Sequence, residues 1–131
     1  MRTLVVEDDF MSRLLLQRLL KPFGESDVAV NGKEAIVAFR LALQENDPYK
    51  LVTLDIMMPE MDGQTVLKEL RSMEAERGIG GLDGAKIVMT TALHDSKNII
   101  QAFKSQCDGY LVKPIDRRKL VDQLQSLGLI D

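Results

Sequence analysis

The sequence contains one cysteine, Cys107, so no internal disulfide bond can form. It has no apolar run as long as a membrane-spanning helix, which needs about 20 residues. It also has no basic-then-apolar leader at its start. With 45% apolar and 28% charged residues and no low-complexity segment, the composition is that of an ordinary globular domain. We therefore expect a cytoplasmic protein that does not interact with a membrane.

An excess of positive charge is also missing. The chain has 17 basic and 20 acidic residues, a formal net charge of −3. A protein that binds nucleic acid through its phosphates needs a basic surface, so we expect no direct contact with nucleic acid. One domain accounts for all of residues 1–131, and we therefore expect no effector domain in this chain.

Strand and helix patterns alternate five times along the chain. Apolar runs typical of strands cover 2–6, 27–30, 50–55, 85–91 and 109–112. Helical periodicity follows each of them, at 10–20, 33–44, from 63 onward, 96–105 and 115–127. Five strand-then-helix units predict an α/β fold with a parallel sheet covered on both faces. In such a sheet the functional site lies beyond the C-terminal ends of the strands.

Polar side chains that suit phosphoryl chemistry stand at these strand ends: Glu7, Asp8 and Asp9 after the first, Asp55 on the third, Thr90 and Thr91 on the fourth, and Lys113 after the fifth. If the first and third strands are neighbours, their carboxylates lie about one strand spacing apart, ~5 Å. Clustered carboxylates repel unless a cation neutralises them, and an all-oxygen cluster suits Mg²⁺. A long lysine can reach such a cluster from two strands away. The pattern indicates a phosphoryl-binding site with Asp55 as nucleophile.

Four segments in this order, "LVVEDD" (4–9), "DIMMPEMDG" (55–63), "MTTA" (89–92) and "YLVKP" (110–114), resemble the receiver domains of bacterial two-component response regulators. The similarity extends over essentially the whole chain and is greatest to the single-domain, chemotaxis (CheY-like) members. It implies a flavodoxin-like, doubly wound sheet of five parallel strands in the order 2-1-3-4-5, flanked by five helices. The strand order comes from the resemblance and not from the strand pattern.

The resemblance also implies roles for individual residues. Asp55 would accept a phosphoryl group from the phosphohistidine of a histidine kinase or phosphotransfer protein. Thr91 would hydrogen-bond one phosphoryl oxygen and Lys113 would neutralise another. Spacing to Lys113 and the small Ala92 that follows favour Thr91 over Thr90. The Lys113–Pro114 bond is expected to be cis, as in relatives.

The metal ligands implied by the resemblance are oxygens from two strand ends. Asp8, Asp55 and the main-chain carbonyl of Met57 would bind Mg²⁺, and Glu7 would act through a metal-bound water. Asp9 is equally well explained as a helix cap. Met57 and Leu93 are apolar where relatives often carry polar side chains that orient a hydrolytic water, so we expect slow autodephosphorylation.

An output surface is expected on the fourth helix, fifth strand and fifth helix. The resemblance implies that Tyr110 turns inward when Thr91 moves toward the phosphoryl group, although ordinary half-buried packing explains Tyr110 equally well. Ile99 and Phe103 lie four residues apart and are expected to form an exposed apolar pair, with Ile100 facing the core. This face would bind a downstream protein, in a monomer or a phosphorylation-dependent dimer.

The function that these features favour is a phosphorylation-dependent switch in two-component signal transduction. Such a protein catalyses its own phosphorylation and dephosphorylation and turns over no metabolite, so it is not an enzyme in the usual sense. An intermediate phosphoryl shuttle in a phosphorelay would have the same site. A phosphatase or dehalogenase is disfavoured because Met57 stands where the second acid of D-x-D belongs. A flavin carrier is disfavoured because three acids follow the first strand, where flavin phosphate needs a glycine- and hydroxyl-rich loop.

Overall fold

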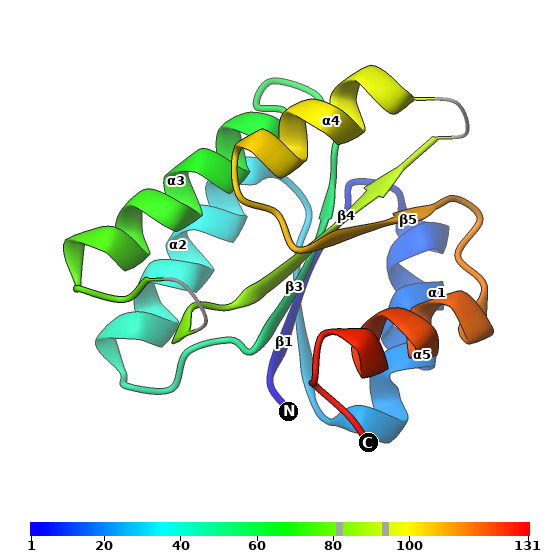
Figure 1. The fold of residues 1–131 in the computed structure, drawn as a ribbon, viewed down its shortest axis with the longest axis horizontal. Coiled ribbons are helices and arrows are strands. Elements are labelled where there is room, and N and C mark those ends of the chain that lie inside the picture. The colour runs from blue at the N-terminus through cyan, green and yellow to red at the C-terminus, as the bar shows by residue number, and fades with distance from the viewer. Residues whose placement is uncertain (81–82, 93–94) are drawn as a thin grey trace.

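The computed structural model describes residues 1–80, 83–92 and 95–131 and has a central parallel sheet with helices on both faces (Figure 1). The strands are β1 (Thr3–Val6), β2 (Ser26–Ala29), β3 (Leu51–Asp55), β4 (Lys86–Thr91) and β5 (Gly109–Val112). The helices are α1 (Phe10–Leu20), α2 (Gly32–Gln44), α3 (Gly63–Glu76), α4 (Ser96–Lys104) and α5 (Arg117–Ser126), with a 3-10 helix η1 (Lys21–Phe23) after α1. The predicted strands and helices are confirmed to within about two residues at their ends. None of the helices described is long and apolar enough to span a bilayer.

The strands are arranged in the order β2-β1-β3-β4-β5, as predicted from the resemblance. β1 pairs in parallel with both β2 and β3, so the sheet grows in one direction from β1 to β2 and in the other from β3 to β5. Connections therefore diverge from the C-terminal ends of β1 and β3, and the gap between them is where ligands bind in sheets of this type. Glu7 follows β1 and Asp55 ends β3, on either side of this gap.

Side chains alternate between two cores because successive residues of a strand point to opposite faces of the sheet. In β1, Leu4 and Val6 pack in the core beneath α2 and α3, whereas Val5 packs in the core beneath α1 and α5. Figure 1 shows α2, α3 and α4 on one face and α1 and α5 on the other. With helices on both faces, β1, β3 and β4 are almost entirely buried, whereas the edge strands β2 and β5 are partly exposed. The central strands can therefore present chemistry to solvent only at their ends.

Local signals start the helices beside this edge. Asp9 and Asp62 are the N-caps of α1 and α3, and each accepts a main-chain N–H three residues later, at 2.9 Å in both cases. Gly63 opens α3 with its N–H bonded to the carbonyl of Ile56 at 2.8 Å. A Cβ atom at Gly63 would collide with the main-chain carbonyl of Asp55. Glycine is therefore required here for α3 to begin directly against the backbone that carries Asp55.

Candidate functional site

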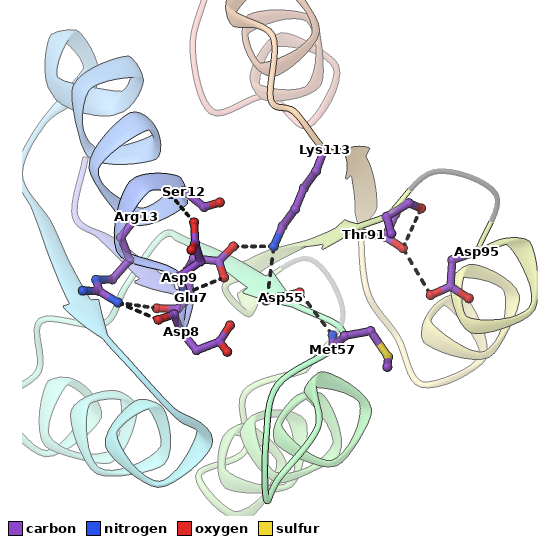
Figure 2. Close-up of polar contacts among 11 residues, drawn as sticks. Glu7, Asp8, Asp9, Ser12, Arg13, Asp55, Met57, Thr91, Asp95 and Lys113 are labelled. Carbon is purple, nitrogen blue, oxygen red and sulfur yellow. Dashed lines mark hydrogen bonds and ion pairs between the residues drawn. The ribbon is translucent and has the colours of Figure 1, made fainter.

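Asp55 is held in one orientation at the C-terminal end of β3, where the residue is 4% exposed. Its Oδ1 accepts the main-chain N–H of Met57 at 3.1 Å. Its Oδ2 lies 3.2 Å from the ammonium nitrogen of Lys113 (Figure 2). The next residue, Ile56, continues the ladder by donating its N–H to the carbonyl of Thr90 at 3.0 Å. These contacts bring a buried carboxylate to the edge of the sheet beside a cation.

Lys113 joins two acids that come from different strands. Its Nζ lies 2.6 Å from Oε1 of Glu7, which is fully buried, as well as 3.2 Å from Asp55. The other Glu7 oxygen accepts the N–H of Asp9 at 3.1 Å. The Lys113–Pro114 peptide bond is cis, which confirms that expectation. The predicted reach of Lys113 across two strands is therefore observed.

The acidic residues form a compact group. One carboxylate oxygen from each of Glu7, Asp8 and Asp55 lies within 4.8 Å of the others, with Glu7 and Asp55 buried and Asp8 exposed. When all three are ionised, the single ammonium of Lys113 leaves two negative charges uncompensated. Charge and oxygen donors together fit a hard divalent cation such as Mg²⁺, which keeps part of its water shell on an open side. Asp9 is outside this group, because its carboxylate caps α1 and the bond from Ser12 lowers its pKa.

The electrostatics of the site follow from its burial. The pKa of Asp55 is raised to about 7, mainly by burial and further by the hydrogen bond and negative charge of Glu7, while Lys113 acts in the opposite direction. Burial alone would lower the pKa of Lys113, but its contacts with Glu7 and Asp55 raise it above the ordinary value. Lys113 therefore stays charged at neutral pH, while Asp55 titrates near neutrality as long as Lys113 is the cation facing it.

The two threonines at the end of β4 differ in their surroundings. Thr90 is paired with Asp55 in the ladder, and its buried hydroxyl has no hydrogen-bond partner among the residues described. Thr91 is 1% exposed and donates to the carbonyl of Ala92 at 3.3 Å and, in a long contact, to Asp95 at 3.5 Å. Figure 2 shows its side chain directed toward Asp95, away from Asp55. The hydroxyl of Thr91 is thus engaged at the start of α4.

Met57 lies at the mouth of the site. Its N–H donates to Asp55, while the residue as a whole is 64% exposed, so its side chain lies largely in solvent. The other apolar residue singled out in the sequence, Leu93, lies outside the residues that the structure describes.

The predicted output surface needs correction at Ile100 and at Ile99. Ile100 is 58% exposed, so the expectation that it faces the core is wrong. Ala102, 1% exposed, is the residue of α4 that packs inward, and Ile100, two positions earlier, points to the opposite side of the helix. Ile99 is half-buried, and not exposed beside Phe103 as expected. Phe103, 46% exposed, contacts Tyr110 edge-to-face at 6.2 Å between ring centroids, so the exposed apolar group is Ile100, Phe103 and Tyr110.

Sequence reasoning missed Arg13. Its guanidinium donates to the main-chain carbonyls of Glu7 and Asp8 at 3.1 and 3.2 Å, which holds the acidic turn against α1 (Figure 2). It also lies over the ring of Phe10, 5.6 Å from the centroid. A basic residue near a helix N-terminus is unfavourable to the helix dipole. That mismatch was the available signal that Arg13 has local acceptors.

A groove beside Lys113 was also not foreseen. It has a volume of about 320 Å³ and lies between α1 and the segment that follows β5. Most of its lining is apolar, from residues that include Met11, Leu15, Pro114 and Ile115, and Lys113 itself reaches its edge. Phe10, Met11 and Leu15 of α1 are 63%, 67% and 38% exposed. The acidic site is thus bordered by an accessible apolar surface.

Comparison with known proteins identifies the same family as the sequence motifs do. A family model described as "Response regulator receiver domain" matches residues 3–125. The chain is 32% identical over 124 residues to chemotaxis protein CheY of Halobacterium salinarum, covering 95% of this chain and 92% of that protein. It is 35% identical over 124 residues to regulatory protein VanRB of Enterococcus faecalis, with 95% of this chain covered. The chain spans only 50% of VanRB, and 17% of the sensory/regulatory protein RpfC of Xanthomonas campestris.

Solved structures with the same fold include two receiver domains crystallised with ligands or partners. The receiver domain of Ssk1 from Saccharomyces cerevisiae, in co-crystals with the histidine phosphotransfer protein Ypd1, has a TM-score of 0.82 at 27% identity over 98% of this chain and 88% of that one. The receiver domain of the histidine kinase CKI1 from Arabidopsis thaliana, complexed with Mg²⁺ and BeF₃⁻, has a TM-score of 0.79 at 26% identity over 97% of this chain and 89% of that one.

Proposed function

The chain belongs to the response regulator receiver domain family, a family of signalling domains, and from this premise we propose that it is a phosphorylation-dependent switch with Asp55 as phosphoacceptor. The observation that carries the proposal is the convergence of Asp55, Glu7, Asp8 and Lys113 from separate strand ends. A buried acid between a charged lysine and two further acids suits phosphoryl transfer better than a structural ion pair, because one ammonium cannot balance three carboxylates.

In the transfer step, a carboxylate oxygen of Asp55 attacks the phosphorus of a partner's phosphohistidine. The new P–O bond forms as the P–N bond breaks, and the imidazole, which is already protonated on its other ring nitrogen, leaves as a neutral ring. Lys113, which stays protonated, neutralises a phosphoryl oxygen, and the hydroxyl of Thr91 donates to another after turning from Asp95. The N–H of Met57 keeps the acid oriented during the step.

The donor set fits Mg²⁺. Asp8, Asp55 and the main-chain carbonyl of Met57 would hold the ion, and Glu7 would act through a bound water. When bound, the ion would neutralise the acids and the charge on the phosphoryl oxygens. The likeness to the CKI1 receiver domain, crystallised with Mg²⁺ and BeF₃⁻, supports this assignment.

The groove between α1 and Pro114 is proposed as the docking site of the phosphodonor, a histidine kinase or a phosphotransfer protein. Its apolar lining adjoins Lys113, so a partner seated there would bring its histidine next to Asp55. The structural likeness to the Ssk1 receiver domain, which was crystallised with Ypd1, supports a partner of this kind and keeps a second role open. That role is an intermediate shuttle in a phosphorelay, with the same site.

The face formed by Ile100, Phe103 and Tyr110 is proposed as the output surface. These side chains are exposed and lie on α4 and β5, the elements that follow Thr91 in the chain. Movement of Thr91 toward a phosphoryl group would remove its contact with Asp95 at the start of α4 and so change this surface. The surface would bind a downstream protein or a second phosphorylated copy.

Loss of the phosphoryl group would also be catalysed within the domain, by attack of water on phosphorus. The exposed apolar side chain of Met57 at the mouth of the site offers no hydrogen bond to orient that water. We therefore expect a long-lived phosphoprotein, and Met57→Asn should shorten its lifetime when decay is followed by intact mass spectrometry. A wild-type protein that loses its label within seconds would contradict this.

Phosphorylation by acetyl phosphate with Mg²⁺ tests the proposal. Intact mass spectrometry should show one added phosphoryl group on the wild type and none on Asp55→Asn. Asp9→Asn is a matched control, because it removes a nearby acid outside the cluster and asparagine caps helices as well as aspartate. If the wild type takes no label, or if Asp55→Asn takes as much as Asp9→Asn, the proposed site is wrong.

A further inference from the structure

A chain of side-chain contacts links the start of α3 to the start of α4. Gln64, the second residue of α3, is 7% exposed, and its Nε2 donates to the main-chain carbonyl of Asn98 at 2.7 Å. The Nδ2 of Asn98 donates to Oδ1 of Asp95 at 2.8 Å. The other oxygen of Asp95 accepts the hydroxyl of Thr91 at 3.5 Å. The contacts therefore run from the helix that follows Asp55 to the threonine assigned to the phosphoryl group.

The series of contacts begins at a rigidly placed part of α3. Gly63 donates its N–H to Ile56, and its lack of a Cβ lets it lie against the main-chain carbonyl of Asp55. Asp62 caps the first turn. Gln64 is therefore fixed relative to the backbone of the acid, and its side chain is a suitable reference point for α4.

The α4 end has fewer constraints among the residues described. Asp95 occupies the N-cap position, but its side chain makes no capping hydrogen bond, because it binds Asn98 and Thr91 instead. The opposite end of α4 is anchored by Arg71, which donates to the carbonyl of Gln106 at 2.9 Å and pairs with Asp108 at 2.7 Å. Displacement of α4 is therefore easiest at its start, where Gln64 supplies a contact from α3.

We propose that Gln64 is a positioning residue that holds the first turn of α4 so that Asp95 keeps the hydroxyl of Thr91 away from Asp55. The inference rests on the proposed function and adds the element that sets its resting state. When Thr91 turns toward a phosphoryl group, Asp95 loses one of its two donors, and the first turn of α4 is released from Gln64. The contacts Gln64–Asn98 and Thr91–Asp95 thus belong to the resting arrangement.

The contacts Gln64–Asn98 and Thr91–Asp95 together act as a latch on the resting arrangement, and the latch is weak enough to be released. The Oε1 atom of Gln64 is buried and has no hydrogen-bond partner among the residues described, which offsets part of the gain from its Nε2 bond. A latch of this kind shifts a two-state equilibrium modestly instead of locking it. One net hydrogen bond corresponds to about a two- to tenfold change in such an equilibrium.

Removal of the donor should therefore favour the phosphoryl-bound arrangement. Gln64→Leu keeps the size of the side chain but cannot donate to Asn98. At saturating Mg²⁺ we expect it to bind beryllofluoride, a phosphoryl mimic, about two- to tenfold more tightly than the wild type does. Asp95→Ala, which removes the side-chain acceptor of Thr91 and leaves only the carbonyl of Ala92, should shift affinity in the same direction. Gln101→Leu is the matched control, an exposed glutamine on α4 whose replacement should leave affinity unchanged.

NMR titration provides both the affinity and a readout that a purely structural role would not move. The side-chain amide signal of Gln64, identified by its loss in Gln64→Leu, should shift when beryllofluoride and Mg²⁺ are added to the wild type. Simple destabilisation would lower thermal stability without tightening beryllofluoride binding. If Gln64→Leu does not fold, the Gln64 signal is assigned on the wild type by triple-resonance spectroscopy, and this signal and Asp95→Ala decide the question.

Two negative results have different meanings. In the first, the wild type responds to beryllofluoride, but both variants show unchanged or weaker affinity, or the Gln64 signal does not move. This result overturns the latch and leaves the proposed function intact. A folded wild type that shows no response to beryllofluoride with Mg²⁺ overturns the proposed function and the latch together.

Discussion

The ammonium group of Lys113 lies nearer to Glu7 than to Asp55, at 2.6 Å against 3.2 Å. Glu7 is fully buried, and its other carboxylate oxygen accepts the N–H of Asp9. In the protein without a divalent ion, Lys113 thus compensates two buried acids and stabilises the fold as well as serving the proposed chemistry.

Replacement of Lys113 by methionine should therefore destabilise the metal-free protein. Two buried carboxylates would face each other without a cation. Because the Lys113 side chain is 27% exposed, we expect a loss below that of a fully buried pair, a fall in the free energy of unfolding of about 1–3 kcal/mol near pH 8. The loss should be smaller near pH 6, where a proton on one acid relieves the repulsion. Urea denaturation at both pH values measures this, with the exposed Lys119→Met as control. Equal losses at the two pH values would contradict the assignment.

The raised pKa of Asp55 predicts how stability varies with pH. The folded-state pKa is about 7 and the ordinary value is 3.8. Between these two pH values the folded protein keeps a proton on Asp55, whereas the unfolded chain has already released it. The free energy of unfolding should therefore decrease as pH rises through this range. Asp55→Asn removes this contribution and should be the more stable protein above about pH 7, by on the order of 2 kcal/mol. Urea denaturation from about pH 5 to 8 without divalent ions measures this, and an unchanged slope would refute it.

Mg²⁺ should stabilise the wild type by binding the folded state only. Asp8→Asn removes an exposed ligand without leaving a buried group unpaired, so we expect the affinity for Mg²⁺ to fall by about tenfold or more. Thermal unfolding at increasing Mg²⁺ concentration measures the affinity. Asp9→Asn should respond as the wild type does, since the Asp9 carboxylate is committed to the α1 cap. Identical responses of Asp8→Asn and the wild type would place the ion elsewhere.

The neighbouring threonines allow a matched comparison. Valine has the shape of threonine without the hydroxyl. Thr90→Val should leave the protein equally or slightly more stable, because the hydroxyl of Thr90 has no partner among the residues described. It should also bind beryllofluoride normally. Thr91→Val should weaken beryllofluoride binding by roughly tenfold through the loss of a charge-assisted hydrogen bond. The reverse order of effects, measured by the same NMR titration, would make Thr90 the switch residue.

The two exposed apolar surfaces should separate input from output. Met11→Asp places a charge at the α1 groove, so transfer from a phosphohistidine donor should slow by about tenfold or more. Its phosphorylation by acetyl phosphate should be normal.

Phe103→Asp should accept phosphate from both donors but lose binding of its activated form to downstream partners or to a second copy. If Phe103→Asp retains every such interaction, the output surface lies elsewhere.

Much of the fold and of the site could be predicted because it depends on local patterns. Apolar runs and helical periodicity located the strands and helices closely. Because parallel strands present their C-terminal ends at one edge, Glu7, Asp8, Asp55 and Lys113 were expected to meet, and they do. The strand order needed the resemblance, since hydrophobic periodicity carries no information on which strands are neighbours.

Side-chain orientation was decided by the tertiary structure. The outward position of Ile100 depends on how α4 rotates to pack Ala102 on the sheet, and the periodicity of a short helix with few buried residues does not determine that rotation. The contact of Gln64 with Asn98 joins residues 34 positions apart, and it exists because α3 and α4 start beside each other on one face. A sequence specifies which groups arrive at an edge of the sheet through local hydrogen bonding and periodic burial. The hydrogen-bond and packing partners of those groups depend on distances that exist only in the assembled fold.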